Sequence, residues 1–259
     1  MSGQLEEVFR MEKYFVDKIT SLGELHLACA FLLDVSESMK GQVMDNLNVA
    51  MQSLREQVVA HAVDPLIKGR VDLAIITFGS EIEVIREFEP ISAMSELPQL
   101  HAEGCAEMAK GIQKAIDLVN ERLKFYSMLG VCCYKPHIFM ITDGVVSSSP
   151  KEMEKATLRI QLEESKGSHG HLSFWALGIG DYDKEQLFSV TNRVMELIDI
   201  NFMEIIEWLF EWVTACRVVS DERIGVNPLP SNVRSLKKCD TSIINENGGY
   251  KNEYNLSKL

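Results

Sequence analysis

The sequence predicts an α/β fold: a doubly wound, mainly parallel sheet with one antiparallel edge strand and helices on both faces. Short apolar runs, typical of strands buried on both faces, alternate with longer stretches of helical periodicity. Such alternation indicates βαβ units, in which each crossover helix covers one face of a parallel sheet. Residues 71–78 form an apolar run, and the strand predicted at residues 82–88 follows after only Gly79, Ser80 and Glu81. So short a connection predicts a hairpin, and therefore an antiparallel strand at one edge.

The individual elements follow in regular order along the chain. Apolar runs predict strands at residues 25–33, 71–78, 82–88, 137–142, 171–178 and 194–198, the last as an edge strand. Apolar positions three or four residues apart predict helices at residues 42–62, 108–123, 150–165, 183–190 and 202–216. The helix at residue 150 begins with a proline after a run of serines, a pattern typical of a helix N-terminus.

The chain divides into a folded domain with an extension at each end. It has 259 residues, of which 46% are apolar, and this length fits one domain with additions. We assign residues 24–217 to the domain and residues 1–23 to an amphipathic helical extension, with its helix at 4–20. Residues 218–259 are rich in asparagine and form a polar tail, either disordered or strapped over the domain. Whether the N-terminal helix packs on its own domain or joins a dimer, and hence the oligomeric state, is left open.

Charge and composition exclude several kinds of partner. The formal net charge of −12 argues against nucleic acid and anionic membranes, which select basic surfaces. The longest uninterrupted apolar run, residues 27–33, is far shorter than the ~20 residues that span a bilayer. The N-terminal residues carry scattered charges, unlike a signal peptide. Six cysteines occur without a CxxC pair, as expected for thiols in a reducing compartment. We therefore expect a soluble, cytoplasmic protein.

The residues that carry chemistry follow two of the buried strands. Asp34, Ser36 and Ser38 occupy alternate positions directly after the first strand, and Asp143 follows the strand at 137–142. In a doubly wound sheet, ligands bind outside the carboxyl ends of the strands, where the strand order reverses. Carboxylate and hydroxyl oxygens are the ligands of a hard cation such as Mg²⁺ or Mn²⁺. If the two strands are neighbours, Asp34 and Asp143 flank one crevice.

These motifs resemble the von Willebrand factor A domain with its metal-ion-dependent adhesion site. The resemblance rests on residues 31–39 (FLLDVSESM) and 141–144 (ITDG), and it covers residues 24–216. It implies a Rossmann-like fold in which Ser36 and Ser38 bind the metal directly. Residues 103–108 (EGCAEM) and 135–144 resemble the bacterial TerY-like branch, which is associated with tellurium resistance and stress response.

The resemblance also implies that Asp34 and Asp143 bind the metal through water. A metal in such a site keeps an open position that an Asp or Glu of a partner protein fills. In the TerY-like branch, this function implies an intracellular scaffold in stress or defence complexes. Some members of that branch carry a cysteine-rich C-terminal metal ribbon, but here the tail has only Cys239.

One position departs from the family pattern. The family has a threonine ligand at the position that aligns with Ala106, and alanine offers no oxygen. The neighbouring Cys105 is a soft ligand that suits a hard ion poorly. Glu103 and Glu107 are the auxiliary candidates for that place, and water is the other. The alternative is an empty site, in which Asp34 and the serines stabilise a turn through local hydrogen bonds.

The leading hypothesis is therefore a binding module, not an enzyme, that takes a carboxylate-presenting protein through Mg²⁺ or Mn²⁺. One alternative is a structural interaction domain that works without metal. Another is a Mg²⁺-dependent phosphohydrolase with Asp34 as its nucleophile, but Ser36 stands where that chemistry usually places a second carboxylate. Trp208 and Trp212, one turn apart on the last helix, form either a second partner-binding patch or part of the core.

Overall fold

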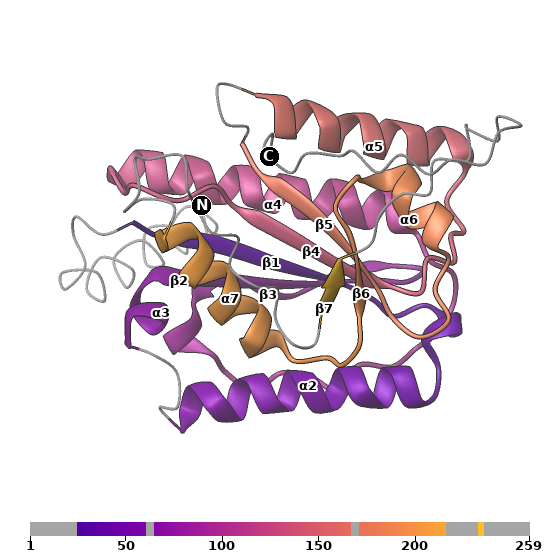
Figure 1. Cartoon of the computed structure of the whole chain (residues 1–259), viewed down its shortest axis with the longest axis horizontal. Coiled ribbons are helices and arrows are strands. Elements are labelled where there is room, and N and C mark those ends of the chain that lie inside the picture. Colours follow the sequence, from indigo (N-terminus) through magenta and orange to yellow (C-terminus); the bar gives the residue numbers. More distant parts are fainter. Residues whose placement is uncertain (1–24, 61–64, 167–170, 216–232, 236–259) are drawn as a thin grey trace, which may run out of the picture.

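The computed structural model describes residues 25–60, 65–166, 171–215 and 233–235. They form one seven-stranded sheet with helices above and below it (Figure 1), in the strand order β3-β2-β1-β4-β5-β6-β7. The predicted N-terminal helix at residues 4–20 lies outside the described residues.

The strands at the centre of the sheet are parallel and buried along their whole length. These central strands are β1 (Leu27–Asp34), β2 (Val71–Phe78) and β4 (His137–Thr142). The sheet continues through β5 (Ser173–Gly178) and β6 (Val194–Leu197), also parallel. β3 (Ile82–Pro90) pairs antiparallel with β2 at one edge, as the three-residue connection predicts.

Helices cover both faces of the sheet. On one face lie α2 (Gln42–Val59), α7 (Phe202–Ala215) and the short α3 (Pro65–Arg70), whose buried side chains form one apolar cluster. On the other lie α4 (Met108–Leu129), α5 (Pro150–Ser165) and α6 (Lys184–Val190), with a second apolar cluster. Within the described residues, no helix combines the length and apolar character that crossing a membrane requires.

The predicted fold class is confirmed, with differences in detail. The segment at 194–198 forms β6, but it is not the last strand, because β7 (Val233–Ser235) pairs antiparallel with it and occupies the sheet edge. The sheet therefore carries a second antiparallel strand, and part of the predicted tail adds to it. Sequence periodicity also missed α3, which is only six residues long and contains Gly69.

The strand order fixes where a ligand site can form. The chain moves from β1 outward to β2 and β3, then returns to place β4 on the other side of β1. The order therefore reverses between β1 and β4, and doubly wound sheets bind their ligands outside the carboxyl ends of the strands at such a point. Asp34 ends β1 and Thr142 ends β4, so the fold brings the two predicted motifs to one place.

The opposite end of the sheet is held by a buried ion pair. Asp72 in β2 is 1% exposed, and its Oδ2 accepts a hydrogen bond from Arg122 of α4 at 2.6 Å and another from the Tyr126 hydroxyl. The Nδ1 of His26 lies 3.7 Å from the same oxygen. Burial alone would raise the pKa of Asp72, but these partners, with the positive charge of Arg122, hold it well below its usual range.

Removal of Arg122 tests the importance of this pair. Arg122→Met leaves the Asp72 carboxylate buried without its cation, so we expect a loss of about 3–5 kcal/mol in the free energy of unfolding. The matched control is Arg159→Met at the exposed Arg159–Asp117 pair, which should cost less than about 1 kcal/mol. Urea unfolding of both variants measures the difference, and equal losses would contradict the prediction.

A buried histidine makes stability depend on pH. The Nδ1 of His137 accepts a hydrogen bond from Trp175 Nε1 at 2.9 Å, and the imidazole stacks on Phe139. Burial, together with the positive charges of Lys135 and Arg193, lowers the pKa of His137 to about 3. Between that pH and about 6.5, where an unfolded histidine titrates, the unfolded chain binds the extra proton. Acidification through this range therefore destabilises the fold.

His137→Gln keeps an acceptor for Trp175 but removes the titrating group. We expect the free energy of unfolding of the wild type to fall faster than that of the variant below pH 6, by up to about 1.4 kcal/mol per pH unit. Urea unfolding at pH 7, 6, 5 and 4.5 measures both slopes. Parallel curves would show that His137 is already protonated in the folded state.

Candidate functional site

Asp34 is the centre of the candidate site. It is completely buried at the end of β1, and its two carboxylate oxygens have different partners. Oδ1 accepts a hydrogen bond from the backbone N–H of Ser36 at 2.9 Å, and Oδ2 accepts one from the Thr142 hydroxyl at 2.5 Å. The first bond shapes the loop after β1, and the second joins β1 to β4.

The loop after β4 is built on Thr142 as well. The Thr142 hydroxyl accepts a hydrogen bond from the N–H of Gly144 at 2.9 Å while it donates to Asp34. One carboxylate oxygen of Asp143 accepts from the N–H of Val145 at 3.0 Å. Asp143 is 9% exposed, so its carboxylate lies at the border between the buried carboxylate of Asp34 and solvent.

A second loop, residues 102–107, is fastened to the first by backbone hydrogen bonds. The N–H of Glu37 donates to Gly104 O at 3.0 Å, and the N–H of Glu103 donates to Val35 O at 2.9 Å. Gly104 has φ +68°, and a Cβ at this position would lie 2.0 Å from the Ser80 Oγ. Glycine is therefore required for the loop to approach β2 and lie beside residues 35–38.

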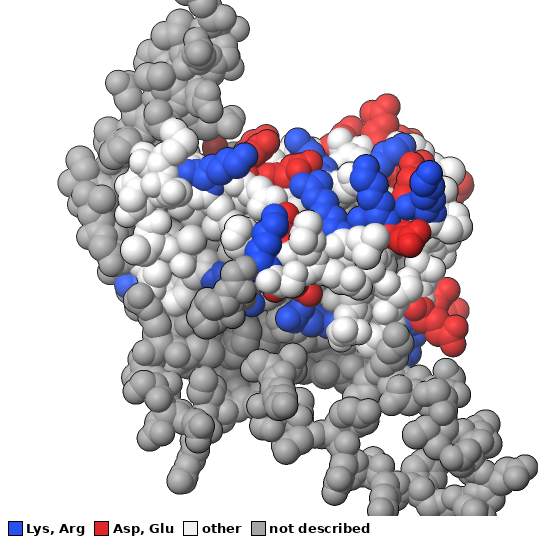
Figure 2. Space-filling model, turned by 90° about the horizontal axis from the view of Figure 1, so that it is seen from above, with Lys and Arg blue, Asp and Glu red and all other residues white. Residues whose placement is uncertain are grey.

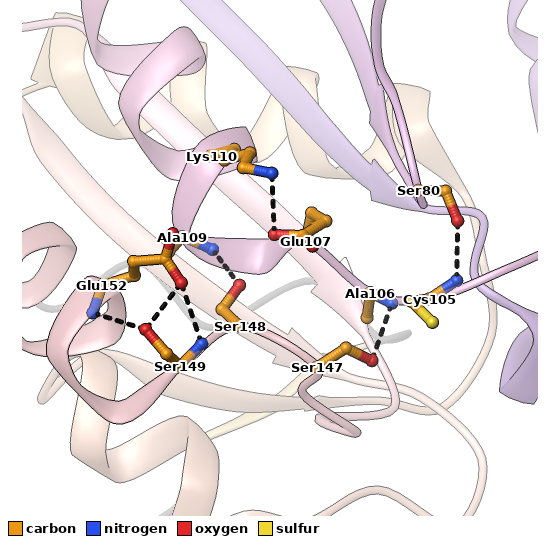
Figure 3. Close-up of polar contacts among 10 residues, drawn as sticks. All are labelled: Ser80, Cys105, Ala106, Glu107, Ala109, Lys110, Ser147, Ser148, Ser149 and Glu152. Carbon is orange, nitrogen blue, oxygen red and sulfur yellow. Dashed lines mark hydrogen bonds and ion pairs between the residues drawn. The ribbon is translucent and has the colours of Figure 1, made fainter.

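The third loop, residues 143–149, ends in three consecutive serines, and two of them contact the second loop and the first turn of α4 (Figure 3). Ser147 Oγ accepts a hydrogen bond from the N–H of Ala106 at 3.2 Å, and Ser148 Oγ accepts one from the N–H of Ala109 at 3.1 Å. Ser149 forms a capping box with Glu152 at the start of α5. The serine run thus positions the first turns of α4 and α5 together at the carboxyl edge of the sheet.

The oxygens of the first loop converge as cation ligands do. The Ser36 and Ser38 hydroxyls are hydrogen-bonded to each other, with their oxygens 3.1 Å apart, a separation that two oxygen ligands of one ion can also have. With the carboxylates of Asp34 and Asp143 they form an all-oxygen donor set, which fits Mg²⁺ or Mn²⁺ with water as the remaining ligand. No cluster of three or more His, Cys, Asp and Glu occurs among the described residues, so a metal here depends on the hydroxyls.

The electrostatics of the site also favour a cation. Burial raises the pKa of Asp34 to about 6, against the hydrogen bonds from Ser36 and Thr142, and the nearby negative charge of Asp143 adds to the rise. Asp34 and Asp143 accept their hydrogen bonds from backbone amides and hydroxyls, which are neutral donors. A positive ion between the two carboxylates would offset both the burial and the repulsion.

The second loop supplies fewer side-chain oxygens to the site than the first loop does. Ala106 is 2% exposed and packs among the apolar side chains next to α4, without an oxygen to offer. Glu107 pairs with Lys110 at 3.3 Å, which directs its carboxylate to that lysine. The side chains of Glu103 and Cys105 are exposed to solvent. Neither auxiliary carboxylate is thus placed against Asp34 or the serines by a contact in the structure.

Trp208 of α7 packs against the core and not at this site. The ring of Trp208 packs edge-on against Trp175, with ring centroids 6.0 Å apart, and is partly buried against the apolar cluster beneath the sheet. The side chain of Trp212 lies outside the described residues.

Sequence reasoning missed two contributors. Thr142 was given no role from the sequence, although it ends β4 one residue before Asp143. Its hydroxyl reaches Asp34 at the end of the neighbouring strand β1. Ser147 and Ser148 were interpreted only as part of a helix start. Their bonds to the second loop join residues 41 and 39 positions apart, which no local pattern indicates.

Comparison with known proteins agrees with this geometry. Residues 29–145 match the family model described as the von Willebrand factor type A domain. This segment spans β1 to the loop after β4 and contains both Asp34 and Asp143. A search of curated proteins gives no match.

Several solved structures are similar in fold. Proximal thread matrix protein 1 from the mussel byssus, with a zinc-occupied MIDAS motif, is 16% identical, with 71% of this chain and 44% of that chain covered and a TM-score of 0.45. Manganese-loaded TRAP protein of Plasmodium vivax is 14% identical, with 70% and 71% covered and a TM-score of 0.45. The ArnB paralog VWA2 of Sulfolobus acidocaldarius is 16% identical, with 73% and 45% covered and a TM-score of 0.45. The chain thus spans less than half of the mussel and Sulfolobus proteins, and likenesses at this level say nothing about partner or activity.

Restoring the absent hydroxyl tests the position of the second loop. We expect Ala106→Thr to tighten Mn²⁺ binding by on the order of tenfold, or about 1.4 kcal/mol, because it adds one oxygen ligand. Ala106→Val is the matched control, since valine has the shape of threonine without the hydroxyl. Calorimetric titration with Mn²⁺ measures both variants, and an equal effect of the two would show that residue 106 does not face the ion.

Proposed function

Since residues 29–145 match the von Willebrand factor type A domain, we propose that the protein is an interaction module whose oxygen-lined site takes a divalent cation and a carboxylate of a protein partner. The observation that carries the proposal is the arrangement around Asp34. Its carboxylate is bonded to the loop after β1 and to Thr142 of β4, and the Ser36 and Ser38 hydroxyls lie 3.1 Å apart beside it.

The residues of the site have distinct parts in this proposal. Ser36 and Ser38 offer direct ligands, while Asp34 and Asp143 supply negative charge and hold water ligands. Thr142 positions Asp34 by its hydrogen bond. A bound Mg²⁺ or Mn²⁺ would supply one open coordination position for a carboxylate oxygen. Because Ala106 contributes no oxygen, the site would hold its metal less tightly than one with a threonine there.

Finer parts of the proposal rest on the sequence. The motifs at 103–108 and 135–144 support a place in the TerY-like branch and a role in a cytoplasmic stress-response or defence complex. We propose that the protein is not an enzyme, because Ser36 stands where a phosphohydrolase would carry its second carboxylate.

A second candidate function is an interaction domain that needs no metal. Ala106 favours it, and so do the hydrogen bonds that already occupy both oxygens of Asp34. In that case the same residues stabilise a loop whose surface binds the partner directly. The two functions differ in whether partner binding responds to a chelator.

Mn²⁺ binding is the first measurement. We expect binding near one equivalent in calorimetry of the wild type, and its loss in Asp34→Ala/Ser36→Ala. Since Asp34 is buried, Ser36→Ala/Ser38→Ala serves as a second variant that keeps the Asp34–Thr142 bond. Asp45→Ala/Ser53→Ala on α2 is the matched control and should bind as the wild type does. Equal binding by all four proteins would place the ion elsewhere.

Partner binding is then compared with and without metal. We expect proteins captured in Mg²⁺ on the wild type to be released by a chelator and to be missing from Ser36→Ala/Ser38→Ala. Quantitative mass spectrometry of the eluates measures this difference. Partners that stay bound in chelator and bind the variant equally would support the metal-independent function instead.

A further inference from the structure

Helices α4 and α5 run side by side and in the same direction. Contacts at three levels fix their register: the N–H of Ala109 donates to Ser148, Arg159 pairs with Asp117, and Asn120 contacts Glu163 at 3.5 Å. Partners along the two helices therefore differ by about 40 positions throughout. Both helices begin at loops of the candidate site, so their N-terminal ends lie next to it (Figure 1).

Four lysines occupy this end of the pair. Lys110 and Lys114 lie one turn apart on α4, and the register places them beside Lys151 and Lys155 of α5. Lys110 pairs with Glu107. The other three form no ion pair with any described residue, and Lys151 and Lys155 are exposed. Positive charge on this face contrasts with the net charge of −12 of the whole chain.

Further along α5 the same stripe becomes apolar. Leu158 and Leu162 are 57% and 58% exposed, high values for leucine in a helix. With Lys151 and Lys155 they occupy positions i, i+4, i+7 and i+11, which lie on one face of a helix. The stripe thus begins with two lysines at the metal-site end and ends with two leucines about 16 Å away, at 1.5 Å per residue.

Figure 2 looks down on this face from the top of Figure 1. Blue side chains extend over much of this face, with red ones among them, and white surface lies beside them. Two carboxylates near these lysines have partners of their own. Glu107 pairs with Lys110, and Glu152 accepts a hydrogen bond from the N–H of Ser149. Glu154, on the next turn of α5, is exposed. The four lysines thus stand against the carboxylates of Glu107, Glu152 and Glu154, so this end of the stripe keeps a small excess of positive charge.

We propose that this α4/α5 stripe, formed by Lys110, Lys114, Lys151, Lys155, Leu158 and Leu162, docks a segment of a protein partner that is acidic at one end and apolar at the other. The acidic end lies over the lysines, next to the metal site, and the apolar end covers the leucines. The inference rests on the proposed function, because the carboxylate that reaches the metal belongs to the same partner.

The chemistry favours an acidic polypeptide over nucleic acid. Two exposed leucines on the stripe gain nothing from a phosphate backbone, whereas apolar side chains of a peptide bury them. Carboxylates beside a lysine cluster steer association and fix the direction of the docked segment. The polarity of the stripe also specifies an order in the partner, with acidic residues nearer to the metal site than apolar ones.

A labelled synthetic peptide tests the stripe directly. The probe has an N-terminal Asp, four Glu in its first half, and two Leu four residues apart in its second half. We expect fluorescence anisotropy to show binding that weakens with salt. Lys151→Glu/Lys155→Glu should weaken it about tenfold, and Leu158→Ser/Leu162→Ser several-fold. A peptide with Lys in place of Glu should regain affinity for Lys151→Glu/Lys155→Glu.

Controls of equal size separate the stripe from general effects. Lys68→Glu/Lys124→Glu, on α3 and at the far end of α4, changes the net charge as much as Lys151→Glu/Lys155→Glu does. Val49→Ser/Val59→Ser removes exposed apolar side chains from α2, as the leucine variant does from α5. Both controls should bind the probe as the wild type does. Equal losses in controls and stripe variants would overturn the proposal. Tighter binding of a single-stranded oligonucleotide than of the peptide, lost in Lys151→Glu/Lys155→Glu, would overturn it also.

The metal-site variant distinguishes the two proposals. If Ser36→Ala/Ser38→Ala loses only the metal-dependent part of peptide binding, both the docking proposal and the carboxylate–metal function stand. If the peptide binds this variant and the wild type equally, yet fails to bind the stripe variants, the docking surface stands and the carboxylate–metal function fails. If the stripe variants bind the peptide as the wild type does, the docking proposal fails whatever the metal does.

Discussion

The hydrogen bond from Thr142 to Asp34 is the interaction on which the rest of the site depends. It joins the ends of β1 and β4, the two strands between which the strand order reverses. Because both residues are completely buried, this bond cannot be replaced by water at low cost. It fixes the direction of the Asp34 carboxylate, whose other oxygen then shapes the loop that carries Ser36 and Ser38. The three loops around the site take their positions from this pair.

Two buried aspartates at opposite ends of the sheet differ in the partners that offset their negative charge. Asp72 has the guanidinium of Arg122 and the hydroxyl of Tyr126 as partners, so the fold itself neutralises its charge. Asp34 has neutral partners, the amide and hydroxyl of Ser36 and the hydroxyl of Thr142, and the carboxylate of Asp143 lies nearby. A protein that needed Asp34 only for stability would gain from a cationic side chain there. In the proposed function, an ion from solution would take that place.

Much of this organisation is readable from the sequence, since buried strands are continuous apolar runs. The motifs after β1 and β4 were placed in one crevice because strand ends of a parallel sheet share an edge. The features that the sequence did not predict depend on contacts between residues far apart in the chain. β7 is three residues long and takes its strand geometry from β6, and the bonds of Ser147 and Ser148 to the second loop have no local signature. The helical periodicity of α7 allowed Trp208 to be either a partner-binding residue or a core residue. In the structure its ring packs against Trp175, next to the core.

The docking stripe offers a reason why a site without a threonine at position 106 is workable. A partner that touches both the metal site and the stripe binds the second surface as an intramolecular event, at an effective concentration that reaches millimolar for short connections. Neither contact then needs to be strong alone. Exposed lysine–carboxylate pairs contribute only about 0.2–1 kcal/mol each, but several of them, with two buried leucines, exceed the free energy that one lost metal ligand removes. Because α4 and α5 both begin at the loops joined by Ser147 and Ser148, the two surfaces are held in a fixed relation, which is the condition for such cooperation.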